Sequence, residues 1–369
     1  MRLTDLYFIL GVSIPSCLSI ILSSIYSTFV WSPLALVSTL ILFNLLKENL
    51  SKKQIYLVLI FVVGVSLNFT LNAIFDNYFY LEEYLIIIMS VFMGLYFFRN
   101  KPSNNTIEIT LLLVFMIQLF LIIFGFEARP HWAPWVYLCL LAVYFSSNLD
   151  NVSFKRSLVL FILGLILGIV SNSRTTILVF TFLLPLLLYF NFRFLISFKA
   201  KKRILSFFMP VFFISFIFYS DLYTSIITSI PIFQGTRLGS LGIQAGPREV
   251  LYGCYISLFE FNWLFFGVDI PSLWQQCRLF FPNIAFGSSE SSIMNIISYF
   301  GFIGVISLLY LTLKSLTYST KSLYGFILLC LLLRSATGDF FIGNVFDWVY
   351  FYSLFFFIDQ SELTKGDLR

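Results

Sequence analysis

The sequence predicts an all-α polytopic membrane protein with about twelve transmembrane helices and one large outer loop. Of its 369 residues, 59% are hydrophobic and 11% are charged, whereas soluble domains carry about 25% charged residues. The apolar residues form long continuous runs, and the run at 6–46 contains no Asp, Glu, Lys or Arg. Strands of a transmembrane β-barrel would instead alternate apolar and polar residues. Helices fit better, because each satisfies its own backbone hydrogen bonds in lipid.

The apolar runs set the expected order of the membrane helices. Their limits are 6–26, 29–46, 55–75, 84–98, 108–126, 133–148, 157–172, 175–192, 204–220, 291–313, 323–336 and 344–358. The first run continues into the second, so we expect a retained span rather than a cleaved signal peptide. Only the connection at 221–290 is long, and long connections in compact proteins usually carry function. We therefore expect one integral membrane domain over 1–369, with a functional loop at 221–290.

The positions of Lys and Arg predict the orientation of the chain, because cytoplasmic loops are enriched in both residues. With the N-terminus inside, all lysines fall on the cytoplasmic side, together with both termini and the basic segment 199–203. The loop at 221–290 then lies outside. The net charge of +5 follows from this bias, so it gives no reason to expect nucleic acid as a partner.

The cations left on the outer side are all arginines. Arginine grips phosphate through two parallel hydrogen bonds, whereas lysine acts as a point charge. This pattern favours an anionic ligand on the outer face, with chance and packing roles as the alternative. The residues are Arg129, Arg174, Arg237, Arg248, Arg278 and Arg334. Tryptophans also fall on or near this side; an interfacial belt explains most of them, and sugar stacking is the more specific hypothesis, for example at Trp263.

Arg174 lies in a short turn, 171–176, between two apolar runs. Ser173 is placed to cap the following helix. The free N–H groups at that helix start, with an arginine beside them, suit a phosphate group. The alternative is an arginine that only extends to the outer headgroups.

The long outer loop carries a second group of candidates. Arg237 lies in a glycine-flanked turn, and Arg248 and Glu249 follow Pro247 at the start of an amphipathic helix expected near 248–265. Such a helix can lie in the interface plane and form the floor of a cavity, or it simply covers the bundle. Cys254 and Cys277 also fall in this loop. We expect them to lie close together, because an oxidising outer compartment permits a disulfide.

Three acidic residues are candidates for orienting or deprotonating a hydroxyl group: Glu249, Asp269 and Glu290, and the sequence does not choose among them. A solvated helix cap is the alternative role for Glu290. His131 is the only histidine, so His-based metal sites and most Ser/His triads are not expected. No phosphate-binding glycine loop with a following lysine is present, and we expect neither a metal nor another cofactor.

Three stretches give the chain a resemblance to the O-antigen polymerase and O-antigen ligase superfamily of bacterial envelope glycosyltransferases. They are the Ser-x-Ser-Arg turn at 171–176, the Arg-helix-aromatic-Phe-Gly-Val run from Arg248 to Asp269, and the span from Glu290 to Gly304 with its Tyr-Phe-Gly-Phe-Ile-Gly segment. The resemblance implies a GT-C-like fold in the bacterial inner membrane. It also implies a donor glycan on undecaprenyl pyrophosphate and a chain-length regulator protein as a partner.

The resemblance also bears on the type of enzyme. Ligases of the superfamily carry a histidine shortly after the Gly-Val run, but this sequence reads Ser-Ser-Glu-Ser-Ser at 288–292. This difference favours a polymerase of lipid-linked repeat units over a ligase that uses lipid A–core as acceptor. A flippase for lipid-linked glycans is the non-enzyme alternative, but two comparable halves are then expected, and the single large loop breaks that symmetry. For the polymerase we assign catalytic roles to Arg174, Arg248 and Glu290, and substrate contacts to Arg129, Arg237, Arg278, Arg334, Glu249, Asp269 and Trp263.

Overall fold

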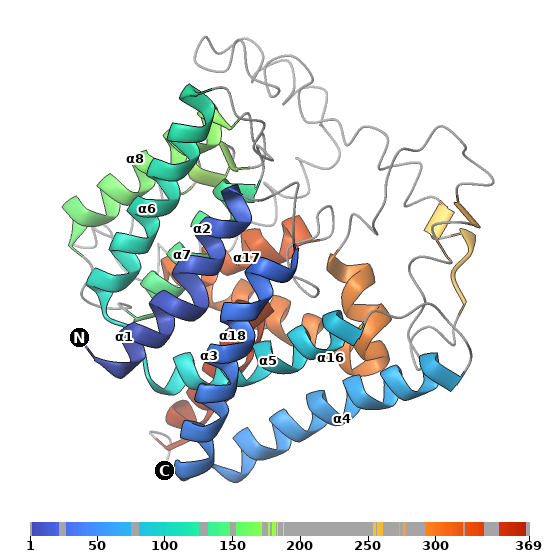
Figure 1. The fold of residues 1–369 in the computed structure, drawn as a ribbon. Coiled ribbons are helices and arrows are strands. Elements are labelled where there is room, and N and C mark those ends of the chain that lie inside the picture. Colours follow the sequence, from blue (N-terminus) through green and yellow to red (C-terminus); the bar gives the residue numbers. More distant parts are fainter. Residues whose placement is uncertain are drawn as a thin grey trace.

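The computed structural model describes residues 2–21, 27–74, 81–124, 132–147, 153–171, 292–319, 322–335 and 347–366, with short pieces between 176 and 187 and between 254 and 277. Within these residues the regular structure is entirely helical, and no strand occurs (Figure 1). The all-α prediction is therefore confirmed for the part of the chain that the structure describes.

The helices follow the predicted apolar runs. Each run except 175–192 and 204–220 coincides with a described helix; the described positions of 175–192 are helical, and 204–220 lies outside the described residues. The first run is one continuous helical segment with a π-helical turn. The last helix extends beyond 358, and the apolar pattern did not predict this extension because the final turns are polar. The elements are α1 (Leu3–Phe8), η1 (Ile9–Ser13), α2 (Ile14–Ile21), α3 (Ser27–Lys47), α4 (Lys52–Ile74), α5 (Leu81–Arg99), α6 (Asn104–Ile123), α7 (Trp132–Ser147), α8 (Phe154–Val170), α16 (Ser292–Ser319), α17 (Leu323–Ser335) and α18 (Asp347–Gly366).

Four of the described helical runs are long and apolar enough to cross a membrane: Leu3–Ile21, Lys52–Thr70, Asn104–Ile123 and Ile293–Ser319. Only 17% of Lys52–Thr70 is buried inside the protein. Its large side chains are open to the surroundings, as shown by Tyr56 at 62% and Leu67 at 58% exposure. Exposed apolar area is unfavourable in water by about 25 cal/mol per Å², so this surface suits lipid. The chain thus has the character of a helical membrane protein.

Helices α17 and α18 are largely buried within the bundle, whereas α16 lies at its edge (Figure 1). Gly94 of α5 allows α18 to approach closely, since a Cβ at this position would lie 2.7 Å from the Tyr352 backbone nitrogen. Phe61 of α4 makes edge-on ring contacts with Phe300 of α16 and Phe351 of α18, at 5.3 and 5.2 Å between ring centroids. Aromatic contacts of this kind join helices that are distant in sequence.

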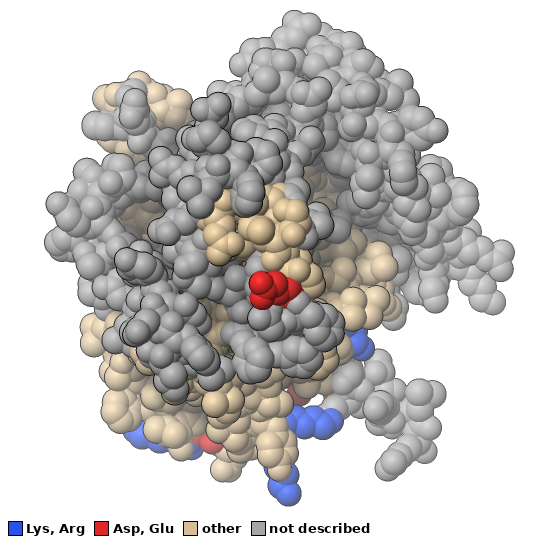
Figure 2. All heavy atoms as spheres, turned by 90° about the vertical axis from the view of Figure 1, so that its right-hand side faces the viewer, with Lys and Arg blue, Asp and Glu red and all other residues tan. Residues whose placement is uncertain are grey.

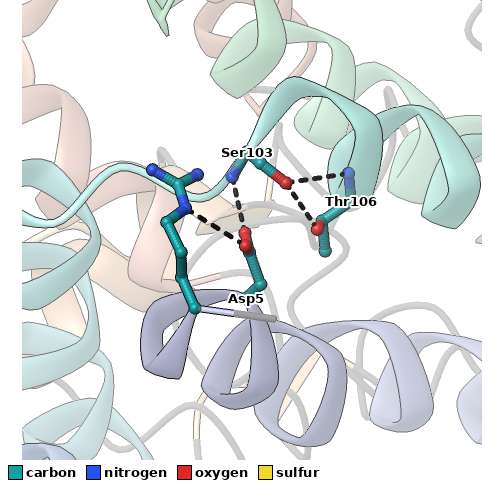
Figure 3. Close-up of polar contacts among 4 residues, drawn as sticks. Asp5, Ser103 and Thr106 are labelled. Atoms are coloured by element: carbon teal, nitrogen blue, oxygen red, sulfur yellow. Dashed lines mark hydrogen bonds and ion pairs between the residues drawn. The ribbon is translucent and has the colours of Figure 1, made fainter.

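Charged residues tie together the helix ends that the Lys/Arg pattern assigns to one side. Arg99 at the end of α5 pairs with Glu48, 2.9 Å away, after the end of α3, and donates a hydrogen bond to Gln54 of α4. At the start of α1, the Asp5 carboxylate accepts a hydrogen bond of 2.7 Å from the Ser103 backbone N–H (Figure 3).

The next pair of helices continues this pattern. Glu108 of α6 accepts a hydrogen bond of 2.8 Å from Tyr144 near the end of α7, and lies 3.6 Å from Arg156 at the start of α8. In Figure 2 the blue and red atoms of the described residues gather mainly at the lower end of the molecule. This end is called the charged face below. Its formation shows that the continuous segment α1–α2 and the helices from α3 to α8 alternate in direction as predicted.

Candidate functional site

Helix α16 is broken at Gly301, within the Tyr-Phe-Gly-Phe-Ile-Gly segment. The backbone there has φ 50° and ψ −129°, which is close to the first central residue of a type II′ turn, a position that favours glycine. After the break the chain folds back sharply. The evidence is that a Cβ at Gly304 would lie only 2.6 Å from the carbonyl oxygen of Ile296, which precedes the break. The helix of the predicted span 291–313 is therefore present but interrupted at Gly301. The continuous part is 302–319, whose length of about 27 Å is close to the thickness of a hydrocarbon core.

A buried hydrogen-bonded chain holds the short first part of α16. Asn68 of α4 donates a bond of 2.9 Å from Nδ2 to the Ser298 carbonyl oxygen, and the Tyr84 hydroxyl of α5 donates one of 2.8 Å to Asn68 Oδ1. The Asn68 amide thus donates to a buried carbonyl three residues before the break. Hydrogen bonds to buried carbonyls stabilise the folded protein.

The outer loop packs against this short part of α16. Cys254 and Cys277 form a disulfide with their Cα atoms 5.9 Å apart, which confirms that these residues lie close together. Together with Tyr255 and Leu273 they form a small buried cluster, against which Leu258, Met294 and Ile297 pack. Met294 and Ile297 belong to α16 before its break. The loop is thus anchored to the first turns of α16.

The amphipathic helix expected near 248–265 is shorter than predicted. Residues 254, 255 and 257 are helical, and the Leu258 N–H donates a bond of 3.0 Å to the Cys254 carbonyl. Residues 259 and 260 are not helical, so the helix does not continue to 265. The Ser257 hydroxyl also bonds the Cys254 carbonyl, at 2.8 Å, and such side-chain bonds compete with helix continuation. Ser257 is exposed while Tyr255 is buried, so the short helical piece is amphipathic as predicted.

The disulfide cluster and the charged face lie at opposite ends of the bundle. Asn68, which contacts the short part of α16, is about 24 Å along α4 from Lys52 at the charged face. Similarly, about 20 Å of helix separates Gly301 from Lys314. The described loop residues therefore lie at the end of the bundle away from the clustered Lys and Arg residues.

Most of the predicted site residues lie outside the described residues. These are Arg129, Arg174, Arg237, Arg248, Glu249, Trp263, Asp269, Arg278 and Glu290. The backbone of Arg334 is described and lies in the last turn of α17. Gly168 of α8 lies close to Ile177, since a Cβ at Gly168 would be 3.2 Å from the Ile177 nitrogen. Within the described residues, no three His, Cys, Asp or Glu side chains gather as metal ligands.

Sequence reasoning missed several polar residues of the bundle interior, because it followed cations and loop residues rather than polar groups within the apolar runs. Asn68 is buried within an apolar run, and Gln118 on α6 and Asp347 at the start of α18 are fully buried. Polar residues inside membrane segments are unfavourable unless they are paired or functional. That rule alone would have selected Asn68 from the sequence, although it would not have shown its partners.

No family model, curated protein or solved structure matches this chain. The expected family therefore rests on the three sequence stretches named above.

Proposed function

We propose that the chain is a glycosyltransferase that polymerises oligosaccharide repeat units carried on undecaprenyl pyrophosphate, at the outer face of a bacterial inner membrane. The complete protein would have twelve spans, a GT-C-like arrangement, cytoplasmic termini and a chain-length regulator protein as a partner. The sequence resemblance supplies the reaction and its substrate class.

One structural observation supports the orientation that this reaction needs. The Cys254–Cys277 disulfide lies at the end of the bundle opposite the charged face. Disulfides persist in oxidising compartments, and clustered Lys and Arg residues mark the cytoplasmic side. Both indicators support an outer position for the loop at 221–290, where a lipid-linked donor and acceptor would meet.

The proposed reaction is a displacement at the anomeric carbon of the donor. A hydroxyl oxygen of the acceptor unit forms the new glycosidic bond as the bond from that carbon to the pyrophosphate oxygen breaks. The hydroxyl proton passes to a carboxylate, for which Glu290 is our first choice over Asp269 and Glu249. Arg174 and Arg248 stabilise the charge that develops on the leaving pyrophosphate, which is the main catalytic demand. The remaining outer arginines and Trp263 hold the glycan and its phosphates.

The test uses the purified protein in vesicles with lipid-linked repeat units as the only substrate. The expected result is longer lipid-linked chains with release of undecaprenyl pyrophosphate in equal amounts. Product that forms only after lipid A–core is added would identify a ligase. Movement of intact lipid-linked units across the vesicle membrane without any new glycosidic bond would identify a flippase. Either of these results would overturn the proposal.

A further inference from the structure

Two parts of the chain that are distant in sequence form one structural unit at the end of the bundle away from the charged face. The unit consists of the described loop residues between 254 and 277 and of residues 292–300, the short first part of α16. It is held together by the disulfide and by the packing of Met294 and Ile297 on the cluster around Cys254 and Cys277. We call it the outer unit. Only Gly301 separates it from the continuous part of α16.

We propose that Asn68 and Tyr84 are positioning residues that fix the outer unit against the bundle at the Gly301 break. Tyr84 is held in turn by edge-on ring contacts with Phe69 and Tyr299, each 5.2 Å between centroids. Its hydroxyl donates to Asn68 Oδ1, which orients the amide so that Nδ2 donates to the Ser298 carbonyl. Both residues are buried, at 6% and 5% exposure, so water cannot easily replace a lost bond.

The inference extends the proposed function, because the outer unit belongs to the loop that carries the proposed substrate contacts. A turn with the geometry of Gly301 permits a change of direction, but a glycine alone does not fix it. The bond from Asn68 to the Ser298 carbonyl fixes the direction of residues 292–300, because it holds Ser298 at a set distance from α4. The packing of Met294 and Ile297 on the disulfide cluster then transmits that position from α16 to the loop. If this chain of contacts is loosened, the loop loses its fixed position while the membrane bundle stays folded.

The test measures amide hydrogen exchange of the purified protein in the variants Asn68→Leu and Tyr84→Phe. In Asn68→Leu we expect about tenfold faster exchange, equivalent to about 1.4 kcal/mol, in peptides from both 293–300 and 254–260. In Tyr84→Phe the expected increase is smaller, because the bond from Asn68 to Ser298 remains. Tyr137→Phe is the matched control: the Tyr137 hydroxyl, also buried, donates a bond of 2.8 Å to the Leu160 carbonyl elsewhere in the bundle.

The inference is overturned if exchange at 293–300 in both variants equals that in Tyr137→Phe. It is also overturned if 293–300 exchanges faster while 254–260 does not change, since the two parts would then not form one unit. The polymerisation assay compares Asn68→Leu and Tyr137→Phe under conditions where both have lost the same amount of melting temperature. Turnover per folded protein should fall in Asn68→Leu and be retained in Tyr137→Phe. Equal turnover in the two variants counts against the positioning role. If the wild-type protein makes no polymer, the proposed function fails, whereas the exchange results still decide whether the two residues position the outer unit.

Discussion

Replacing Gly301 by alanine should destabilise the protein through its backbone alone. At φ 50° and ψ −129°, an L side chain costs about 1–3 kcal/mol. The chain has one way to avoid this strain, which is to straighten α16. Straightening would move Ile297 away from the disulfide cluster and break the bond from Asn68 to Ser298. A buried hydrogen bond contributes about 1 kcal/mol, so both routes lower the free energy of unfolding by a similar amount.

Thermal unfolding of the purified protein in detergent measures this loss. A decrease of 1 kcal/mol lowers the melting temperature by about 2–4 °C in domains of moderate size. Gly301→Val should be worse than Gly301→Ala, because β-branched residues tolerate positive φ least. Gly64→Ala is the matched control: Gly64 lies in α4, and a Cβ there would meet only the terminal carbon of Ile303, at 3.1 Å. Equal melting temperatures for Gly301→Ala and Gly64→Ala would refute the reasoning.

Three further predictions concern the disulfide, the arginines and the helix core. Replacing Cys254 and Cys277 by serine should remove about 3 kcal/mol of stabilisation from the loop, given the separation of 23 residues. Pegylation of denatured wild-type protein should find both thiols blocked, and free thiols would contradict the prediction. Arg174→Ala and Arg248→Ala should each slow polymerisation about a hundredfold or more when the variants are present in the membrane at equal abundance. Lysine at the same positions should restore part of the rate. Near-normal polymer from both alanine variants would remove the basis for the pyrophosphate site. Gly94→Ala should cost about 1–3 kcal/mol by overpacking against the α18 backbone, measured as a lower melting temperature; an unchanged value would show that the helices separate freely.

Hydropathy predicted the positions of the membrane helices well, because the cost of exposing a backbone in lipid applies to each helix separately. It did not predict the break in α16. Gly301 lies in an apolar run like other helical glycines, and the bond next to the break comes from Asn68, which is 230 residues from Ser298 in sequence. The same reason explains why Tyr84 was not selected as a functional residue. Of the candidate site, the cysteine pairing is confirmed by the structure, while the outer arginines remain predictions drawn from charge and motif.

The contact between α5 and α18 has a consequence for how the protein is made. Gly94 and the backbone of Trp348 approach closely enough that a Cβ would lie 2.9 Å from the Trp348 carbonyl, yet these residues are separated by most of the chain. At synthesis rates of about 5–20 residues per second, α5 waits on the order of tens of seconds before α18 emerges. During this time the surface of α5 around Gly94 is without its partner helix. A chain that stops before α18 would therefore keep its early helices but lack the segment that completes its core. Assembly of the bundle in the membrane thus depends on the C-terminal helix.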